Sequence, residues 1–336
     1  MAQGSVTIID LAAGLGLSKT TVADALKGSG RVSESTRRRV QQAAQEMRYV
    51  SNRAARQLRT NSTEALALYI PPHVRNMSFY MPFAFGVADG ASRYNYDLTL
   101  IAQRAGSTAS WSQVDGVIII DAVADDPVVK SLIDLNVPIV TAGHIAGFPE
   151  DRVAGIIEIE HKRMCAAVLD ELKSRGASRP AFIAPTPGAA DSWSEQVRDG
   201  YLSWCAANGV PVNMVTIPVI PTNEELEAAL ASVLSDVETD AILFGWHDVA
   251  NRGELQLERM GHRVGKSILL GALASSEENL HSAYLTVLDL RPREFGDAAV
   301  ELLHEVIQNP PSGTIHRLHE VKIVADRSVK NQPGSA

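Results

Sequence analysis

From residue 61 to about residue 330, short apolar runs alternate with longer stretches of helical pattern, and no other feature limits the possible folds as much. Many of the apolar runs are continuous and β-branched, as in strands buried on both faces of a parallel sheet. Strands that alternate with helices of this size predict βαβ units. The expected strands are 65–70, 97–101, 114–120, 138–142, 181–184, 215–218, 241–244 and 268–271. The expected helices are 81–95, 127–135, 161–175, 195–207, 224–236, 249–260 and 293–307.

The expected βαβ units fall into two similar runs, before and after about residue 160. We therefore expect an α/β domain with two doubly wound lobes, each built on a parallel sheet. Ligands of such sheets bind at the carboxyl ends of the strands. A small-molecule site is thus expected in the cleft where the two lobes face each other.

The charge of the chain is distributed unevenly. The formal net charge is −8 over 336 residues, but residues 1–60 carry +6 and the remainder carries −14. A basic N-terminal part on an acidic body is typical of a protein that meets phosphate at one end. The length suits one small domain and one large domain.

Cysteine content and hydropathy indicate the compartment. The chain has two cysteines, Cys165 and Cys205, which we interpret as reduced, buried thiols of a cytosolic protein. No apolar run follows a basic start, and no apolar stretch approaches the roughly 20 residues that span a bilayer. We expect a cytoplasmic protein without a membrane partner.

Residues 6–47 have the pattern of a small helical domain. Thr7, Ser18 and Ser33 each precede an amphipathic stretch and are good N-caps. Three short helices result, with a turn of three to four residues between the first two, which is typical of a helix-turn-helix. The alternative is a plain three-helix bundle without a DNA-binding role.

The start of the second helix favours the DNA-binding interpretation. In helix-turn-helix proteins these residues meet base edges, and here they are Lys19, Thr20 and Thr21. A lysine can donate to guanine, and a threonine methyl can pack on a thymine methyl. Asp24 either accepts from a cytosine amino group or pairs with a basic neighbour, and pairing is the favoured reading. The three arginines at 37–39 either contact phosphate or are solvated.

Residues 51–59 form a short basic segment. Asn52 can cap a helix, but a helix this short is marginal in water and should order only against DNA and a second copy of itself. Few apolar residues lie near Leu58 in the sequence. An apolar side chain flanked by arginines can insert between base steps in the minor groove and kink the DNA. Arg59 suits a narrowed minor groove.

Residues 6–59 resemble the DNA-binding headpiece and hinge helix of the lactose repressor/galactose repressor (LacI/GalR) family of transcription regulators. The stretches TIIDLAAGLGLSKTTVADALKG, GRVSESTRRRV and NRAARQL carry the resemblance, in order and spacing. It implies an all-α helix-turn-helix domain over 1–51, a hinge helix over 52–60 and an effector-binding and dimerisation domain over 61–330.

The resemblance also implies which residues contact DNA. Lys19, Thr20 and Asp24 would read bases, and Asp24 departs from the basic or polar residue common at that position. Leu58 would insert at the centre of a palindromic operator, with Arg59 beside it in the minor groove. The full set of candidate DNA-contacting residues is Thr7, Ser18, Lys19, Thr20, Thr21, Asp24, Arg31, Asn52, Ala55, Leu58 and Arg59.

The body is similar to the effector domain of the same family, which has the fold of periplasmic sugar-binding proteins. The stretches VDGVIII, WHD and LTVLDLRPREFG carry this looser likeness. It implies lobes at about 61–160 and 161–290, a crossover near 287–293, and a C-terminal segment that completes both lobes. The candidate effector-binding residues are Tyr80, His144, Trp193, Arg198, Trp246, His247 and Asp248.

Two positions depart from the family pattern. An arginine is common three residues before Gly200, where this chain has Val197, and an acid is common where it has 272–274, Ala-Leu-Ala. These changes imply a different ligand, a less polar pocket or no small ligand, and the sequence leaves the three open.

The sequence thus predicts a DNA-binding transcription regulator, most readily a repressor. It would bind a palindromic operator as a homodimer and respond allosterically to a sugar or related metabolite, without cofactor, metal or catalytic residues. The alternative is a solute-binding protein of a transport system, against which the basic head argues. An enzyme is disfavoured because no nucleophile elbow, P-loop or dinucleotide fingerprint follows a strand.

Overall fold

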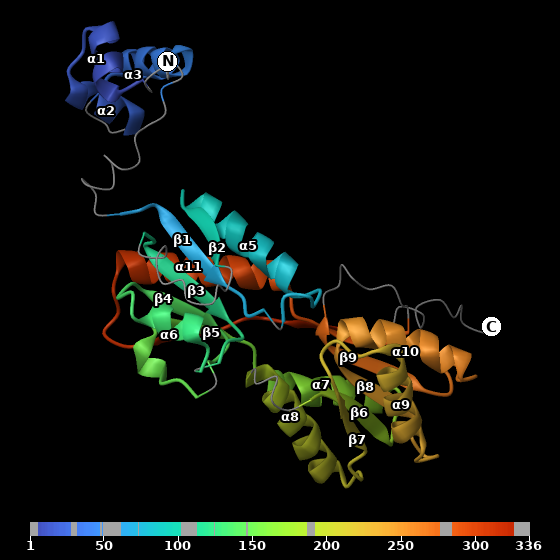
Figure 1. Cartoon of the computed structure of the whole chain (residues 1–336). Coiled ribbons are helices and arrows are strands. Elements are labelled where there is room, and N and C mark those ends of the chain that lie inside the picture. The colour runs from blue at the N-terminus through green and yellow to red at the C-terminus, as the bar shows by residue number, and fades with distance from the viewer. Residues whose placement is uncertain are drawn as a thin grey trace. The chain divides into compact units, whose positions relative to one another are not determined.

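A computed structural model describes residues 6–27, 32–47, 49, 62–72, 74–101, 113–123, 125–145, 147–186, 192–275 and 284–325 (Figure 1). Contacts within the chain divide it into two compact units, residues 1–63 and 64–336. In the described part of the chain, no helix combines the length and hydropathy that crossing a membrane requires.

The first unit contains three helices, α1 (Ile8–Leu15), α2 (Lys19–Lys27) and α3 (Glu34–Glu46). They pack around a core of Leu11, Val22, Ala25 and Val40, all fully buried. A small apolar core of this kind holds the helices in a fixed arrangement, so that α2 presents a defined outer face.

Local caps explain where these helices begin. The Thr7 hydroxyl accepts from the Asp10 amide and the Asp10 carboxylate accepts from the Thr7 amide, a complete capping box. Ser18 and Ser33 each accept the amide three residues on. The three N-caps expected from the sequence are confirmed. Gly16, at φ +64°, ends α1 in the left-handed conformation that glycine adopts at little cost.

The second unit contains two six-stranded sheets. The first has the order β11-β5-β4-β3-β1-β2, and all its pairs are parallel. Its strands are β1 (Ala65–Tyr69), β2 (Asp97–Ile101), β3 (Gly116–Ile120), β4 (Ile139–Ala142), β5 (Gly155–Glu158) and β11 (Ile315–Leu318). Alternate residues of β1 and β3 pack on opposite faces, so both faces of this sheet are buried.

The second sheet has the order β12-β10-β9-β8-β6-β7, parallel except for β12, which runs antiparallel to β10. Its strands are β6 (Pro180–Pro185), β7 (Met214–Ile217), β8 (Ala241–Trp246), β9 (Leu269–Ser275), β10 (Leu285–Asp289) and β12 (Lys322–Val324). The two doubly wound lobes expected from the sequence are confirmed.

Helices cover the sheets of both lobes. In the first lobe α5 and α11 lie side by side, with α6 in the cluster on the opposite face of the sheet (Figure 1). In the second, α7 and α8 lie together and α9 and α10 lie together. The helices are α5 (Tyr80–Arg93), α6 (Pro127–Ile133), α7 (His161–Ser174), α8 (Ser192–Asn208), α9 (Asn223–Leu234), α10 (His247–Arg259) and α11 (Pro292–Gln308).

The chain passes between the lobes three times. The passages join β5 to α7, β10 to α11, and β11 to β12. Residues after 290 therefore contribute a covering helix and a strand to the first lobe and an edge strand to the second. The segments 159–160, 290–291 and 319–321 are where the lobes connect.

Some boundaries differ from the sequence-based expectation. The expected helix began at residue 195, but α8 begins at Ser192 and places Trp193 in its first turn. Similarly, α10 begins at His247 rather than at residue 249. Helix propensity is a weak guide to a first turn, because tertiary packing decides it: both tryptophans at these starts, Trp193 and Trp246, are buried.

Candidate functional site

The outer face of α2 carries the candidate base-reading residues. Lys19 and Thr20 are exposed at its first turn. The Ser18 and Thr21 hydroxyls lie 2.8 Å apart, and the Ser18 oxygen accepts the Thr21 amide at 3.0 Å, so both take part in the cap. Asp24 is half-buried one turn further along the helix. The start of α2 thus offers a lysine and a threonine to a partner.

The arginines of α3 have roles within the unit. Arg37 and Arg38 pair with Glu34 at 3.2 and 3.5 Å. Arg39 donates from Nη2 to the carbonyl of Leu15 at 2.6 Å, which satisfies an end carbonyl of α1. Five further candidates lie outside the described residues: Arg31, Asn52, Ala55, Leu58 and Arg59.

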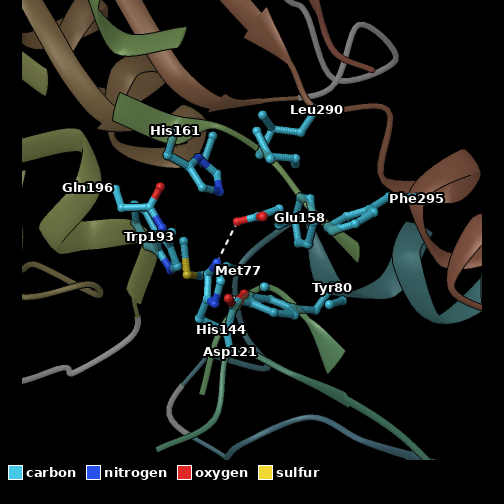
Figure 2. Close-up of a pocket in the computed structure, with 15 residues that line it drawn as sticks. Met77, Tyr80, Asp121, His144, Glu158, His161, Trp193, Gln196, Leu290 and Phe295 are labelled. Carbon is cyan, nitrogen blue, oxygen red and sulfur yellow. Dashed lines mark hydrogen bonds and ion pairs between the residues drawn. The ribbon is translucent and has the colours of Figure 1, made fainter. Parts of the chain in front are cut away.

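The second unit has a pocket between its lobes, lined by fifteen residues that enclose about 520 Å³, part of it open to solvent (Figure 2). The first lobe supplies Tyr80, Asp121 and His144, and the second supplies Trp193 and Gln196. The remaining lining residues are Met77, Phe79, Ala142, Gly143, Glu158, Ile159, His161, Ala274, Leu290 and Phe295. A mainly apolar lining with few polar groups is typical of a small-molecule site.

Asp121 is placed in the pocket by the end of a strand. It follows β3 directly, with φ +46°, and its Oδ2 accepts the Tyr80 hydroxyl at 2.6 Å. Tyr80 is the first residue of α5 and is buried. The carboxylate therefore lies at the carboxyl end of the first sheet, where ligands of doubly wound sheets bind.

His144 lies between two carboxylates. Its Nε2 is 2.5 Å from Glu158 Oε2 and its Nδ1 is 2.8 Å from Glu150 Oε1. The imidazole ring of His144 thus links two carboxylates. The dashed line in Figure 2 marks the bond from His144 to Glu158, which is the last residue of β5.

His161 and Trp193 lie on the second-lobe side of the pocket. Burial lowers the pKa of His161 from 6.5 to about 4, so its ring is neutral at pH 7. The two ring centroids are 6.4 Å apart. Trp193 is 4% exposed, and its Nε1 has no hydrogen-bond partner in the described structure.

The pocket brings together three of the seven residues proposed from the sequence: Tyr80, His144 and Trp193. The other four, Arg198, Trp246, His247 and Asp248, are not among the lining residues. His247 Nε2 instead lies 2.8 Å from Asn251 Nδ2. Asp248 reaches the other lobe, where its Oδ2 accepts the amide and hydroxyl of Ser78 at 3.2 and 3.1 Å.

The candidates from the sequence did not include Asp121, Glu158, His161, Gln196 and Phe295, which line the pocket. Asp121 had a usable signal, since it directly follows the run GVIII at a strand end. Within the described residues, no group of three or more His, Cys, Asp and Glu side chains is placed to hold a metal ion.

Comparison with known proteins shows what these two units resemble. Residues 7–52 match the family described as bacterial regulatory proteins, lacI family, and residues 169–329 match the periplasmic binding protein-like domain. The first of these two matches lies within the helix-turn-helix unit. The second match covers most of the second lobe and the C-terminal crossovers.

Two curated relatives of this chain are named as a transcriptional regulator and a control protein. It is 32% identical to the HTH-type transcriptional regulator CelR of Thermobifida fusca, over 53% of this chain and 55% of that one. It is 26% identical to catabolite control protein A of Priestia megaterium, over 62% and 63%. The chain thus matches between about half and under two thirds of the length of these relatives.

Solved structures show the same fold. The CelR–cellobiose complex superposes with a TM-score of 0.68 at 22% identity, covering 96% of this chain and 99% of that one. The lac repressor dimer bound to operator and the anti-inducer ONPF gives 0.75 at 18% identity, covering 95% and 98%. The helix-turn-helix unit followed by two parallel-sheet lobes is therefore the fold of these regulators.

Proposed function

We propose that this protein is a sequence-specific DNA-binding transcription regulator, acting as a repressor under the control of a small-molecule effector. The observation that carries the proposal is the union of two units in one chain: a capped helix-turn-helix that matches the lacI family, and a two-lobed domain with a pocket between its lobes. In this proposal residues 1–51 bind DNA, 52–60 form the hinge helix, and 61–330 bind effector and dimerise.

The geometry of α2 supports base reading. Lys19 and Thr20 are exposed at the end of the helix that enters the major groove in helix-turn-helix proteins. Leu58 and Arg59, proposed from the sequence for the minor groove, complete the contact. A regulator that binds an operator would work in the cytoplasm, which is the location we propose.

Exposed apolar side chains support a homodimer. Met81 and Phe85 on α5 are 53% and 54% exposed, and Leu255 on α10 is 59% exposed. Large apolar groups in water on helices of both lobes suit burial against a second copy. A dimer with two-fold symmetry would match a palindromic operator, with one reading helix for each half-site.

The pocket supports control by a small molecule. The CelR structure is described as a complex with cellobiose, and a sugar or related metabolite is our proposed effector class. Ligand and operator would each favour one arrangement of the lobes, so that each changes the affinity for the other by the same factor. We propose no catalysis, because the relatives are named as regulators.

A solute-binding protein of a transport system is the second candidate. The two-lobed unit and its pocket fit that role, and the periplasmic binding protein-like match favours it for residues 169–329. The capped helix-turn-helix has no use in such a protein, which is why the regulator is preferred.

Selection from random duplex DNA tests the proposal. The full chain is incubated with a pool of random duplexes, with and without candidate sugars, and the retained DNA is sequenced. An enriched palindrome supports a dimeric sequence reader, and loss or gain of enrichment with a sugar supports effector control. No enrichment under any condition, from protein that melts cooperatively, would leave the solute-binding alternative.

A further inference from the structure

The indole of Trp193 lacks a hydrogen-bond partner. The side chain is 4% exposed, lines the pocket, and its Nε1 has no acceptor in the described structure. A buried indole N–H normally finds an acceptor, because leaving it without one is costly. In Figure 2 the indole lies beside Gln196, across the view from Phe295 and Tyr80. The unsatisfied N–H thus belongs to a side chain that lines the pocket.

Carboxylates line the same pocket. Asp121 accepts the Tyr80 hydroxyl at 2.6 Å, and Glu158 lies 2.5 Å from His144. Both carboxylates have further lone pairs, since an ionised carboxylate can accept about four hydrogen bonds. A ligand with hydroxyl groups could donate to them while it accepts from the indole.

The lining of the pocket carries little positive charge. None of the described residues that line the pocket is a lysine or an arginine. His144 points one ring nitrogen at Glu158 and the other at Glu150, so both of its ring nitrogens already face carboxylates. His161 is neutral at pH 7, since burial lowers its pKa to about 4. An anionic ligand would meet two carboxylates in a mainly apolar site, where like charges repel strongly.

We propose that Trp193 anchors the effector through its Nε1–H, and that the pocket selects uncharged, hydroxyl-bearing ligands over their phosphorylated or carboxylated counterparts. The proposal rests on the proposed function in taking this pocket as the effector site. It goes further by naming the donor and the sign of charge that the site rejects.

The test uses the full chain and matched pairs of probes. Thermal melting and calorimetry are run with neutral mono- and disaccharides, each beside its phosphate or sugar acid, including cellobiose with cellobionic acid and glucose with glucose 6-phosphate. We expect at least one neutral sugar to bind and its acidic partner to bind at least about tenfold more weakly, as repulsion from two carboxylates requires.

Trp193→Phe removes the N–H and keeps an aromatic ring, and should weaken binding of the same sugar about tenfold. Trp204→Phe is the matched control on α8, because Trp204 Nε1 donates to Asp170 at 2.7 Å and does not line this pocket. Asp121→Asn removes one negative charge and should reduce the ratio of affinities between the neutral sugar and its acidic partner. This variant tests the charge argument and leaves the indole unchanged.

Three results would overturn the inference: an acidic probe that binds as tightly as its neutral partner, unchanged affinity in Trp193→Phe, or no neutral sugar bound by the folded protein. The DNA selection separates this failure from failure of the proposed function. An enriched palindrome together with no binding of any neutral sugar refutes the inference and leaves the DNA reader in place. If the protein binds neutral sugars selectively and this binding depends on Trp193, but no DNA sequence is enriched, only the proposed role as a transcription regulator is refuted.

Discussion

At the scale of single residues, the pocket obtains its polar groups from strand ends. Asp121 directly follows β3, and Glu158 is the last residue of β5. Each carboxylate has a fixed hydrogen-bond partner, Tyr80 for Asp121 and His144 for Glu158. Such bonds hold the carboxylates in place before a ligand arrives, which lowers the cost of ordering them on binding.

Replacing Lys19 by alanine tests the role of a single residue in DNA reading. If the ammonium donates to a base edge, Lys19→Ala should weaken operator binding by about 1–3 kcal/mol, mostly through one base position. Affinities for the selected operator and its single-base variants provide the measurement. An equal loss on every sequence would instead make Lys19 a phosphate contact.

His161 gives the protein a pH dependence with a definite sign. Burial lowers its pKa from 6.5 to about 4, so between these values the unfolded chain binds more protons than the folded one. The free energy of unfolding should therefore be fully retained above pH 6.5 and decrease as the pH falls toward 4. Burial also lowers the pKa of His319, which acts in the same direction.

Thermal midpoints between pH 7.5 and 4.5 measure this effect. His161→Gln cannot bind the proton, so its midpoint should fall less steeply over that range than that of the unchanged protein. Parallel curves for the two proteins would show that His161 does not carry the linkage.

At the scale of elements, α5 and α11 approach closely because each has a glycine at the crossing. A Cβ on Gly86 would lie 1.9 Å from the Arg293 carbonyl oxygen, and one on Gly296 would lie 2.2 Å from that of Phe83. Both obstacles are backbone atoms, which cannot rotate away. Ion pairs from Arg293 to Asp89 and from Arg93 to Asp297 flank the crossing on the exposed side.

Gly86→Ala should therefore destabilise the two-lobed unit by about 1–3 kcal/mol or more, since overpacking outweighs the gain in helix propensity. Chemical denaturation of the full chain measures the loss. Gly14→Ala is the matched control, because its Cβ would meet only Met47 Sδ at 3.9 Å. A Gly86 variant as stable as the original would mean that the helices can separate at little cost.

Element type could be predicted where the sequence pattern was strong and local. The strand β3, with its run of valine and isoleucine, was expected within two residues of its observed bounds. By contrast β5, β11 and β12 have three or four residues each, and β11 is partly exposed, so neither length nor hydropathy marked them. Their existence depends on partners distant in the sequence.

The sequence predicted where the pocket lies but only some of the residues that line it. Its position follows from the carboxyl ends of parallel strands, and the sequence proposes three of its lining residues, Tyr80, His144 and Trp193. Glu158 and Phe295 come from crossover segments, whose positions depend on how both lobes close. Sequence reasoning had no signal for that geometry.

At the scale of the whole molecule, a hydrogen-bonded contact joins the lobes outside the pocket. Asp248, in the first turn of α10, accepts both the amide and the hydroxyl of Ser78, which precedes α5. His319 links the crossovers: its amide donates to the Glu158 carbonyl, and its Nε2 lies 3.0 Å from the Leu290 carbonyl. These bonds depend on the angle between the lobes.

Asp248→Ala should loosen the contact between the lobes. The Ser78 amide loses its acceptor, so it should exchange with deuterium faster in the ligand-free protein, while amides in the sheet cores stay protected. Hydrogen exchange read by mass spectrometry measures this. Glu258→Ala, an exposed acid on the same helix, is the control. Unchanged exchange at Ser78 would show that other contacts hold the lobes together.

The threefold passage of the chain has a consequence for biosynthesis. The first lobe begins at β1, yet its sheet receives β11 and its helical cover receives α11. A ribosome that has made only the first 290 residues has therefore released an apolar sheet face without its cover. The lobe that is translated first reaches its native state only after residue 318 has emerged, so a nascent chain of this protein should need protection from aggregation for most of its synthesis.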